Sequence, residues 1–95
     1  MISAIVLIKA EVAHIPEAAQ AIAEIEGISE VYSVTGDVDL IAIARVARHE
    51  DFHEVIADRL NKVQGVLETS THIAFRTYSA TDLGAGFAIG FEDAD

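Results

Sequence analysis

The chain has 95 residues, of which 52% are hydrophobic, and its mean hydropathy is +0.35. Sixteen acidic residues stand against six basic ones, which gives a formal net charge of −10 and a pI near 4.6. The basic residues are scattered singly and form no stripe along a phosphate backbone, so direct nucleic-acid binding is not expected. The absence of cysteine excludes disulfides, Cys-ligated zinc and thiol chemistry.

The first residues of the chain do not have the composition of a targeting signal. No basic segment or small-residue cleavage site is present, and the first apolar run ends at Lys9, too short to span a bilayer. We therefore expect a soluble, cytoplasmic protein without a membrane partner. A domain of this size buries only roughly 60–65% of the surface that its unfolded chain exposes, so a chain this apolar is also expected to form subunit interfaces.

The first half of the chain predicts a strand, a helix and a second strand. Residues 2–10 are apolar on both faces, which indicates a central strand. Pro16 and Glu17 suit the first turn of a helix that Gly27 ends. Residues 28–35 mix polar and apolar side chains and predict an edge strand. The apolar face of this helix is formed by Ala18, Ala21, Ile22 and Ile25.

The second half predicts the same order of elements. Residues 40–46 form another central strand, and a helix runs from about Glu50 to Val63 before Gly65. Residues 66–78 alternate and predict a second edge strand. The apolar face of the helix comprises Phe52, Val55, Ile56, Arg59, Leu60 and Val63. The two faces of the last strand are Leu67, Thr69, Thr71, Ile73 and Phe75 on one side, and Glu68, Ser70, His72 and Arg76 on the other.

An internal repeat supports this division. Residues 25–30, Ile-Glu-Gly-Ile-Ser-Glu, align with residues 63–68, Val-Gln-Gly-Val-Leu-Glu, at a constant offset of 38 (63 minus 25). Two βαβ units with right-handed crossovers interleave into an α+β, ferredoxin-like βαββαβ fold: an antiparallel four-stranded sheet with two helices on one face. The other face is rich in aliphatic residues, so we expect a partner subunit to cover it as in a dimeric α+β barrel.

The C-terminal segment differs in composition. We expect the folded domain to span residues 1–79 and residues 80–95 to form a tail that docks on a neighbouring subunit through Phe87, Ile89 and Phe91. The Gly-Ala-Gly at residues 84–86 is weak support for a phosphate loop, because no strand leads into a helix around it.

The polar loop between the two middle strands is the candidate binding site. Gly36-Asp37 suits a turn with a positive φ, and a glycine lets another molecule approach the backbone closely. Such a loop can hold a small zwitterion, with Asp39 meeting an ammonium group and the free N–H groups meeting a carboxylate. The alternative is that Asp37 and Asp39 cap the turn through hydrogen bonds to the backbone, and local chemistry alone favours it.

A zinc-like motif occurs before the second helix. His49-Glu50-Asp51-Phe52-His53 matches the H-E-x-x-H pattern, but it falls at the helix boundary and only His72 follows as a further histidine. Favourable first-turn charges at Glu50 and Asp51 explain the segment more simply. No metal or other cofactor is predicted, and no nucleophile elbow supports Ser/His/Asp catalysis.

The chain resembles the ligand-binding and assembly domain, or RAM domain, of the Lrp/AsnC family of transcription regulators. Three segments carry the resemblance: residues 34–41 (Val-Thr-Gly-Asp-Val-Asp-Leu-Ile), residues 27–32 and residues 65–71. The similarity covers residues 2–79. Because Met1 directly precedes the first strand, we expect the helix-turn-helix to be absent, as in stand-alone members of the family.

The resemblance implies an effector-binding module rather than an enzyme. Its implied partners are an amino acid or related small effector, copies of itself in a dimer and then an octamer or decamer, and a full-length Lrp/AsnC-type regulator. The effector would bind where dimers meet, beside the hairpin loop. By match to the motif, the ligand contacts would be Gly36, Asp37, Val38, Asp39, Thr69 and Thr71.

Two other function classes stay open. The first is a small enzyme on a dimeric α+β barrel, such as a cofactor-free monooxygenase. The sequence offers no evident buried His/Asp pair or aromatic-lined pocket for it, since it holds four Phe, two Tyr and no Trp. The second is a structural assembly domain whose loop binds nothing.

Overall fold

The computed structural model describes residues 1–80, so the docking residues expected in the tail lie outside the described residues. The strands are β1 (Ile2–Ala10), β2 (Ile28–Ser33), β3 (Leu40–Val46) and β4 (Val66–Ile73). They form one antiparallel sheet in the order β2-β3-β1-β4. The predicted ferredoxin-like arrangement is confirmed, with β1 and β3 central because both of their faces are apolar.

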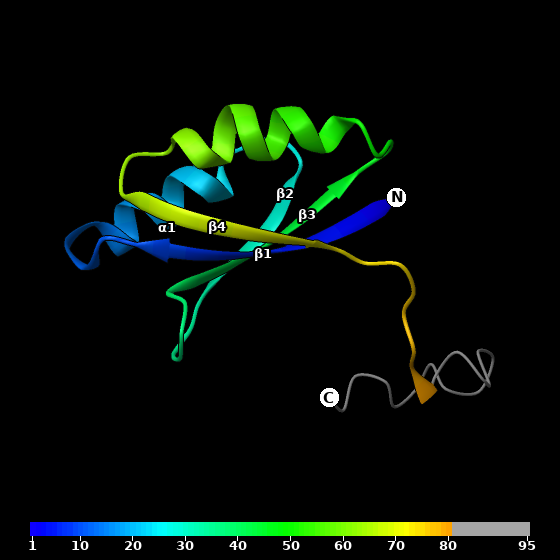
Figure 1. The fold of residues 1–95 in the computed structure, drawn as a ribbon, viewed down its shortest axis with the longest axis horizontal. Coiled ribbons are helices and arrows are strands. Elements are labelled where there is room, and N and C mark those ends of the chain that lie inside the picture. The colour runs from blue at the N-terminus through cyan, green and yellow to red at the C-terminus, as the bar shows by residue number, and fades with distance from the viewer. Residues whose placement is uncertain (81–95) are drawn as a thin grey trace.

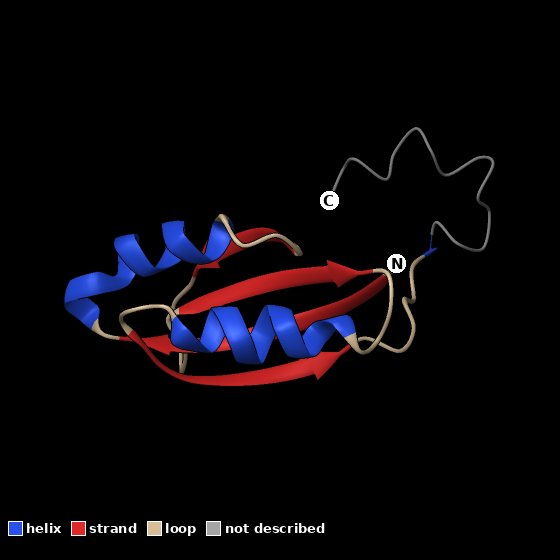
Figure 2. Ribbon diagram, turned by 90° about the horizontal axis from the view of Figure 1, so that it is seen from above, coloured by secondary structure: helices blue, strands red, loops and turns tan. Residues whose placement is uncertain are grey.

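The helical segments lie on one face of this sheet, as predicted (Figures 1 and 2). A short 3₁₀ turn, η1 (Val12–His14), leads from β1 into α1 (Ile15–Ala23). After β3, the chain forms η2 (His53–Arg59), which is wound as a π-helix, and then the 3₁₀ turn η3 (Leu60–Lys62). Within residues 1–80, no helix is long and apolar enough to cross a membrane.

The core lies between the helices and the sheet. Alternate residues of the central strands face the helices, and several of them are alanines, which let the helices approach closely. The described core contains no buried polar or charged side chain. Its members from the strands are Ala4, Val6, Ile8, Ala10, Ile28, Leu40, Ala42, Ala44 and Val46. The helices and their flanking turns add Ala18, Ile22, Phe52, Val55, Ile56 and Leu60.

The first helix differs in detail from the sequence prediction. It ends at Ala23 rather than at Gly27, which has a φ of 104° in the turn that precedes β2. Ala18 and Ile22 are buried as predicted and Ile25 is half-buried, but Ala21 is exposed. The face is therefore centred on Ala18 and Ile22, which lie one turn apart on the side that meets the sheet.

The second helix differs more, because its winding is not that of an α-helix. In a π-helix, hydrogen bonds join residues five apart, so side chains five apart lie nearly above one another. The structure pairs such residues: Arg59 Nη2 lies 2.7 Å from Glu54 Oε2, and His53 Nε2 lies 3.7 Å from Asp58 Oδ1. The prediction that Arg59 belongs to the apolar face was wrong, since this winding turns it toward Glu54 on the surface.

The edge strands are shorter than predicted. β4 was expected to reach Tyr78 but ends at Ile73, since the last backbone bond to β1 runs from Ala74 N to Ser3 O at 2.9 Å. Beyond that point β1 offers no further partner. β2 ends at Ser33 rather than Thr35. A register shift at Lys9 and Ala10 also interrupts the predicted alternation of β4, and Leu67 beside it is 64% exposed.

The internal repeat appears in the structure as two equivalent turns. Gly27 and Gly65 have φ values of 104° and 96°, and each immediately precedes an edge strand. The same hydrogen bond closes both turns, from Ile28 N to Ile25 O at 3.0 Å and from Val66 N to Val63 O at 3.1 Å. The glycine carbonyls then accept equivalent long-range bonds, from Arg45 N to Gly27 O and from Glu11 N to Gly65 O, both 2.8 Å.

Candidate functional site

The predicted site is the loop of residues 34–39 between β2 and β3, which projects from one end of the sheet on the side away from the helices (Figure 1). Its ends are joined by a hydrogen bond of 3.0 Å from Val34 N to Asp39 O. Gly36 has a φ of 119°, which confirms the predicted positive φ. A Cβ at this position would meet nothing within 4 Å, so the loop backbone is open to an approaching molecule.

Asp39 is fixed more firmly than a loop residue usually is. Its backbone N donates to Ile8 O at 2.9 Å, and its Oδ2 accepts a hydrogen bond of 2.9 Å from Ala10 N. The side chain is half-buried, whereas Asp37 is exposed and Val38 is half-buried. One carboxylate oxygen of Asp39 therefore accepts a hydrogen bond at the end of β1 rather than within the turn that the capping interpretation invoked.

The antiparallel register brings one of the two predicted threonines to the same end of the sheet. Thr69 pairs with Ile8, the residue whose carbonyl accepts the Asp39 N–H. Asp39 and Thr69 thus flank β1, at a separation on the order of 10 Å given the usual spacing of two strands. Thr71 lies two residues further along β4, toward the middle of the sheet.

The hydroxyl of Thr69 is already engaged. Its Oγ1 is 2.7 Å from Asn61 Oδ1 on η3, on the face of the sheet that carries the helices. A small pocket of about 190 Å³ lies here and is lined by Thr69 together with Asn61 and residues 66–68. The hairpin loop and this pocket are therefore separated by β1, and a ligand that contacts both would have to reach around the end of that strand.

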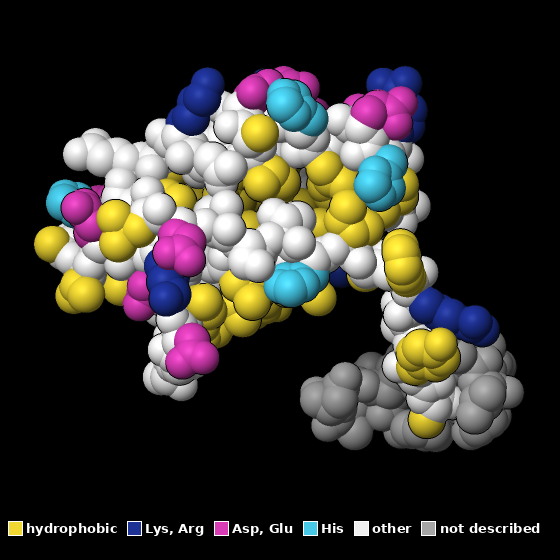
Figure 3. Space-filling view, viewed as in Figure 1, with side chains coloured by type: hydrophobic (Ala, Val, Ile, Leu, Met, Phe, Trp, Pro, Cys, Tyr) yellow, Lys and Arg dark blue, Asp and Glu magenta, His cyan; other side chains and the backbone are white. Residues whose placement is uncertain are grey.

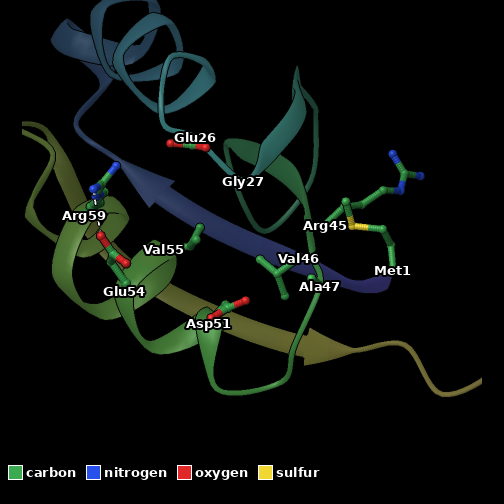
Figure 4. A pocket seen from close by; sticks show the side chains of 10 residues that line it. All are labelled: Met1, Glu26, Gly27, Arg45, Val46, Ala47, Asp51, Glu54, Val55 and Arg59. Atoms are coloured by element: carbon green, nitrogen blue, oxygen red, sulfur yellow. Dashed lines mark hydrogen bonds and ion pairs between the residues drawn. The ribbon is translucent and has the colours of Figure 1, made fainter.

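A larger pocket, of about 400 Å³, lies at the opposite end of the sheet and was not predicted (Figure 4). Four segments that are distant in the sequence line it: the start of β1, the turn before β2, the end of β3, and η2 with the turn that precedes it. Its lining residues are Met1, Glu26, Gly27, Arg45, Val46, Ala47, Asp51, Glu54, Val55 and Arg59. No sequence motif marks it, although Glu26 and Gly27 belong to the internal repeat.

The two histidines of the H-E-x-x-H segment have different neighbours. The ring of His49 packs edge-on against Phe52, with 5.9 Å between centroids, while His53 lies near Asp58. Among residues 1–80, no group of three or more His, Asp or Glu side chains is placed to hold a metal ion. Asp51 instead accepts a hydrogen bond of 3.2 Å from Arg48 N, a helix-start contact that suits its predicted role as a first-turn charge.

We call the sheet face opposite the helices the open face. Its apolar centre consists of Ile5, Leu7, Tyr32, Ile41 and Ile43, which the strand register places side by side. Ile5 is 40% and Tyr32 is 51% exposed. Hydrophobic side chains are visible along the underside of the sheet in Figure 3. A contiguous apolar patch of this kind is a candidate interaction surface.

Tyr32 lies at the β2 side of the open face. Its hydroxyl donates a hydrogen bond of 2.5 Å to Glu30 Oε2. This bond and the negative charge of Glu30 raise the pKa of Tyr32 above its ordinary value, with a smaller contribution from desolvation, while the nearby charge of Arg45 opposes the shift. Tyr32 therefore stays protonated and presents a ring and a hydroxyl at the rim of the apolar centre.

Comparison with known proteins places the chain in a family of regulators. A family model described as the Lrp/AsnC ligand binding domain matches residues 3–83. The HTH-type transcriptional regulator LysM of Saccharolobus solfataricus is 36% identical over 63 residues, which cover 66% of this chain and 44% of LysM. The chain spans about half or less of the length of such curated relatives.

Solved structures share the fold. The crystal structure of TTHA0845 from Thermus thermophilus has a TM-score of 0.79 and 39% identity, and the match covers 83% of this chain and 99% of that one. The transcriptional regulator NMB0573 of Neisseria meningitidis, solved as a complex with L-Met, shares the fold with a TM-score of 0.73 at 16% identity, over 82% of this chain and 52% of that one. The chain therefore belongs to the Lrp/AsnC ligand-binding domain family.

Proposed function

We propose that this chain is an amino-acid-binding, self-assembling effector module that does not bind DNA by itself. The observation that carries the proposal is the geometry of Asp39. Its carboxylate is half-buried and held by Ala10 N–H at 2.9 Å, beside a loop whose Gly36 leaves the backbone uncovered. An anion that is fixed in this way loses little conformational freedom when a cation binds it.

The chemistry suits a zwitterion. The second carboxylate oxygen of Asp39 would accept a hydrogen bond from a ligand ammonium group, a charge-assisted contact that contributes about 1.5–3 kcal/mol. The backbone N–H groups of residues 36–38 would donate to the ligand carboxylate. The L-Met bound to the Neisseria regulator supports an amino acid as the ligand class. Thr69 lies across β1 and would meet the ligand only at the end of that strand.

We also propose that the open faces of two subunits pack together, and that the dimers assemble into an octamer or decamer. The apolar centre supports this arrangement, because a sheet face of that kind is normally covered. In the assembly a second subunit would approach the end of the sheet where the hairpin loop projects, so the effector would bind between dimers. The module would then alter transcription by joining a full-length relative that carries a helix-turn-helix.

The Asp39→Asn variant tests the site. Asparagine keeps the shape and an oxygen that accepts from Ala10 N–H, so the hairpin should survive, but the negative charge is lost. We expect effector affinity to fall roughly tenfold or more, since each 1.4 kcal/mol is a factor of ten. Calorimetry with the twenty amino acids, beginning with L-methionine, measures this change. Asp58→Asn removes the same charge from an exposed position on η2 and serves as the control.

Two outcomes would contradict the site assignment. Unchanged affinity in Asp39→Asn, with assembly intact, would leave Asp39 as a structural residue. No measurable heat with any amino acid would favour the alternative of a structural assembly domain.

Gly36→Val should lose more affinity than Asp39→Asn, because a β-branched side chain resists a φ of 119° and would cover the backbone that meets the ligand carboxylate.

A second prediction concerns DNA. With a net charge of −10, the 95-residue chain should cause no mobility shift of duplex DNA at physiological salt. The same assay with an added full-length Lrp/AsnC-type regulator would show whether the chain changes the regulator's shift. A salt-sensitive shift by this chain alone would contradict the proposal that it has no DNA-binding activity of its own.

A further inference from the structure

The pocket at the far end of the sheet has firmly held walls. Gly27 O accepts a hydrogen bond of 2.8 Å from Arg45 N, which ties the turn before β2 to β3. The same glycine packs so closely on η2 that a Cβ would lie 2.8 Å from Val55 Cγ2. Val46 at the end of β3 and Val55 on η2 are only 6% and 7% exposed, and their side chains give the pocket an apolar floor.

The π-winding of η2 brings Arg59 into the lining of this pocket. In an α-helix, residues five apart would point about 140° away from each other. Here Glu54 and Arg59 lie on one side, joined by a 2.7 Å contact from Arg59 Nη2 to Glu54 Oε2 (Figure 4). A π-helix is rare and frequently marks a functional site. The Arg59 guanidinium has five N–H donors, so its contact with Glu54 leaves several of them for another acceptor.

Two other charged side chains of the lining already have partners. Asp51 faces Arg48, with Oδ1 3.5 Å from Arg48 Nη2, and Arg45 Nη1 donates to the neutral Ser29 Oγ at 2.7 Å. Glu26, in contrast, makes no hydrogen bond or ion pair within the described residues. The pocket thus offers an unpaired carboxylate, a guanidinium with spare donors, and an apolar floor.

We propose that this pocket binds a zwitterionic amino acid with an aliphatic side chain. Glu26 would accept from the ligand ammonium group, Arg59 would donate to the ligand carboxylate, and the aliphatic side chain would lie on Val46 and Val55. The volume of about 400 Å³ is ample for such a ligand and falls within the range of small-molecule sites. An acidic side chain is disfavoured, because it would meet the apolar floor and the carboxylates at the rim.

This site is separate from the hairpin loop and does not depend on it. β1 runs from the pocket at its first residues to Asp39 at its last, and it is nine residues long. At about 3.3 Å per residue, the two sites lie on the order of 27–30 Å apart. A chain with both sites would bind two amino acids, and variants at one site should leave the other unchanged.

The test is calorimetry of the full chain with L-isoleucine as the probe and L-glutamate as the control ligand. Glu26→Gln should weaken L-isoleucine binding at this site about tenfold, and Arg59→Gln should do the same. Glu24→Gln and Arg76→Gln make the same charge changes outside the pocket and should have no effect. N-acetyl-L-isoleucine and L-isoleucinamide, which lack the cation and the anion respectively, should each bind about tenfold more weakly than L-isoleucine.

The outcomes separate this site from the hairpin loop. Binding that is lost in Glu26→Gln and kept in Asp39→Asn supports the pocket, and the reverse pattern overturns it while leaving the proposed function intact. Equal binding of L-glutamate and L-isoleucine also overturns it. If Arg59→Gln loses structure, Arg59→Lys can replace it, because lysine keeps the charge but lacks the planar fork of the guanidinium. Unchanged affinity in both Arg59→Lys and Glu26→Gln would again rule the pocket out.

Discussion

Replacing Gly27 with alanine is expected to lower the free energy of unfolding by roughly 2–5 kcal/mol, the largest loss we expect from adding one methyl group. Two costs combine at this position. The φ of 104° disfavours any residue with a side chain, and the new Cβ would lie 2.8 Å from the buried Val55 Cγ2. Thermal and urea denaturation measure the loss, and a domain of this size should melt lower by about 8 °C or more.

Gly36→Ala provides the matched control. Its φ of 119° carries a similar backbone cost, but a Cβ there meets nothing within 4 Å. Only the strain of roughly 1–2 kcal/mol should remain. The difference between the two variants therefore measures how tightly the turn packs on η2. Equal losses in both would show that Val55 moves aside without cost and that the turn is held by its hydrogen bonds alone.

Ile43→Glu is expected to reduce the assembly to monomers at micromolar concentration. Ile43 lies in the open face between Ile5 of β1 and Glu30 of β2. A glutamate there would place a second carboxylate beside Glu30 and would bury a charge in the proposed interface, at a cost of several kcal/mol. Light scattering should find the wild type at least dimeric and the variant near the 10.2 kDa mass of one chain.

Val12→Glu is the control for this experiment. Val12 is 83% exposed and lies on η1, outside the open face, so the variant adds the same charge without changing the proposed interface. Its assembly should match that of the wild type. A stable wild-type monomer, or an Ile43→Glu variant that assembles normally, would contradict pairing through the open face and would require another surface for assembly.

The order and type of most elements follow directly from the sequence. β1 and β3 are apolar at both parities and are central, while the mixed strands β2 and β4 are edges. The winding of η2 does not follow, because Phe52, Val55, Ile56 and Leu60 suit an α-helix as well as a π-helix. Only the structure shows that Arg59 pairs with Glu54. β4 ends early because β1 ends and offers it no further partner. The alternation of side chains within β4 carries no information about the length of β1.

The two candidate sites also differ in how much of each could be predicted from the sequence. The hairpin loop is contiguous in the sequence, so its positive-φ glycine and its aspartates are recognisable there. The hydrogen bond from Ala10 N to Asp39 Oδ2 joins residues that are 29 apart in the sequence, so it depends on how the strands pair. The pocket at the other end is assembled from four separate segments with ordinary residues, and no local pattern in any one of them indicates that they meet. Tertiary contacts alone define it.

The position of β1 in the sheet also bears on how the chain acquires its fold. β1 is made first, yet its two neighbours come much later: Ile8 pairs with Leu40, and Ala4 pairs with Ile73. Contacts between residues so far apart in sequence slow folding, because a long loop must close before they form. A growing polypeptide would carry this strand, apolar on both faces, unpaired until β3 has been synthesised. The β2-β3 hairpin is the local pairing that can form earlier and offer β1 its first edge.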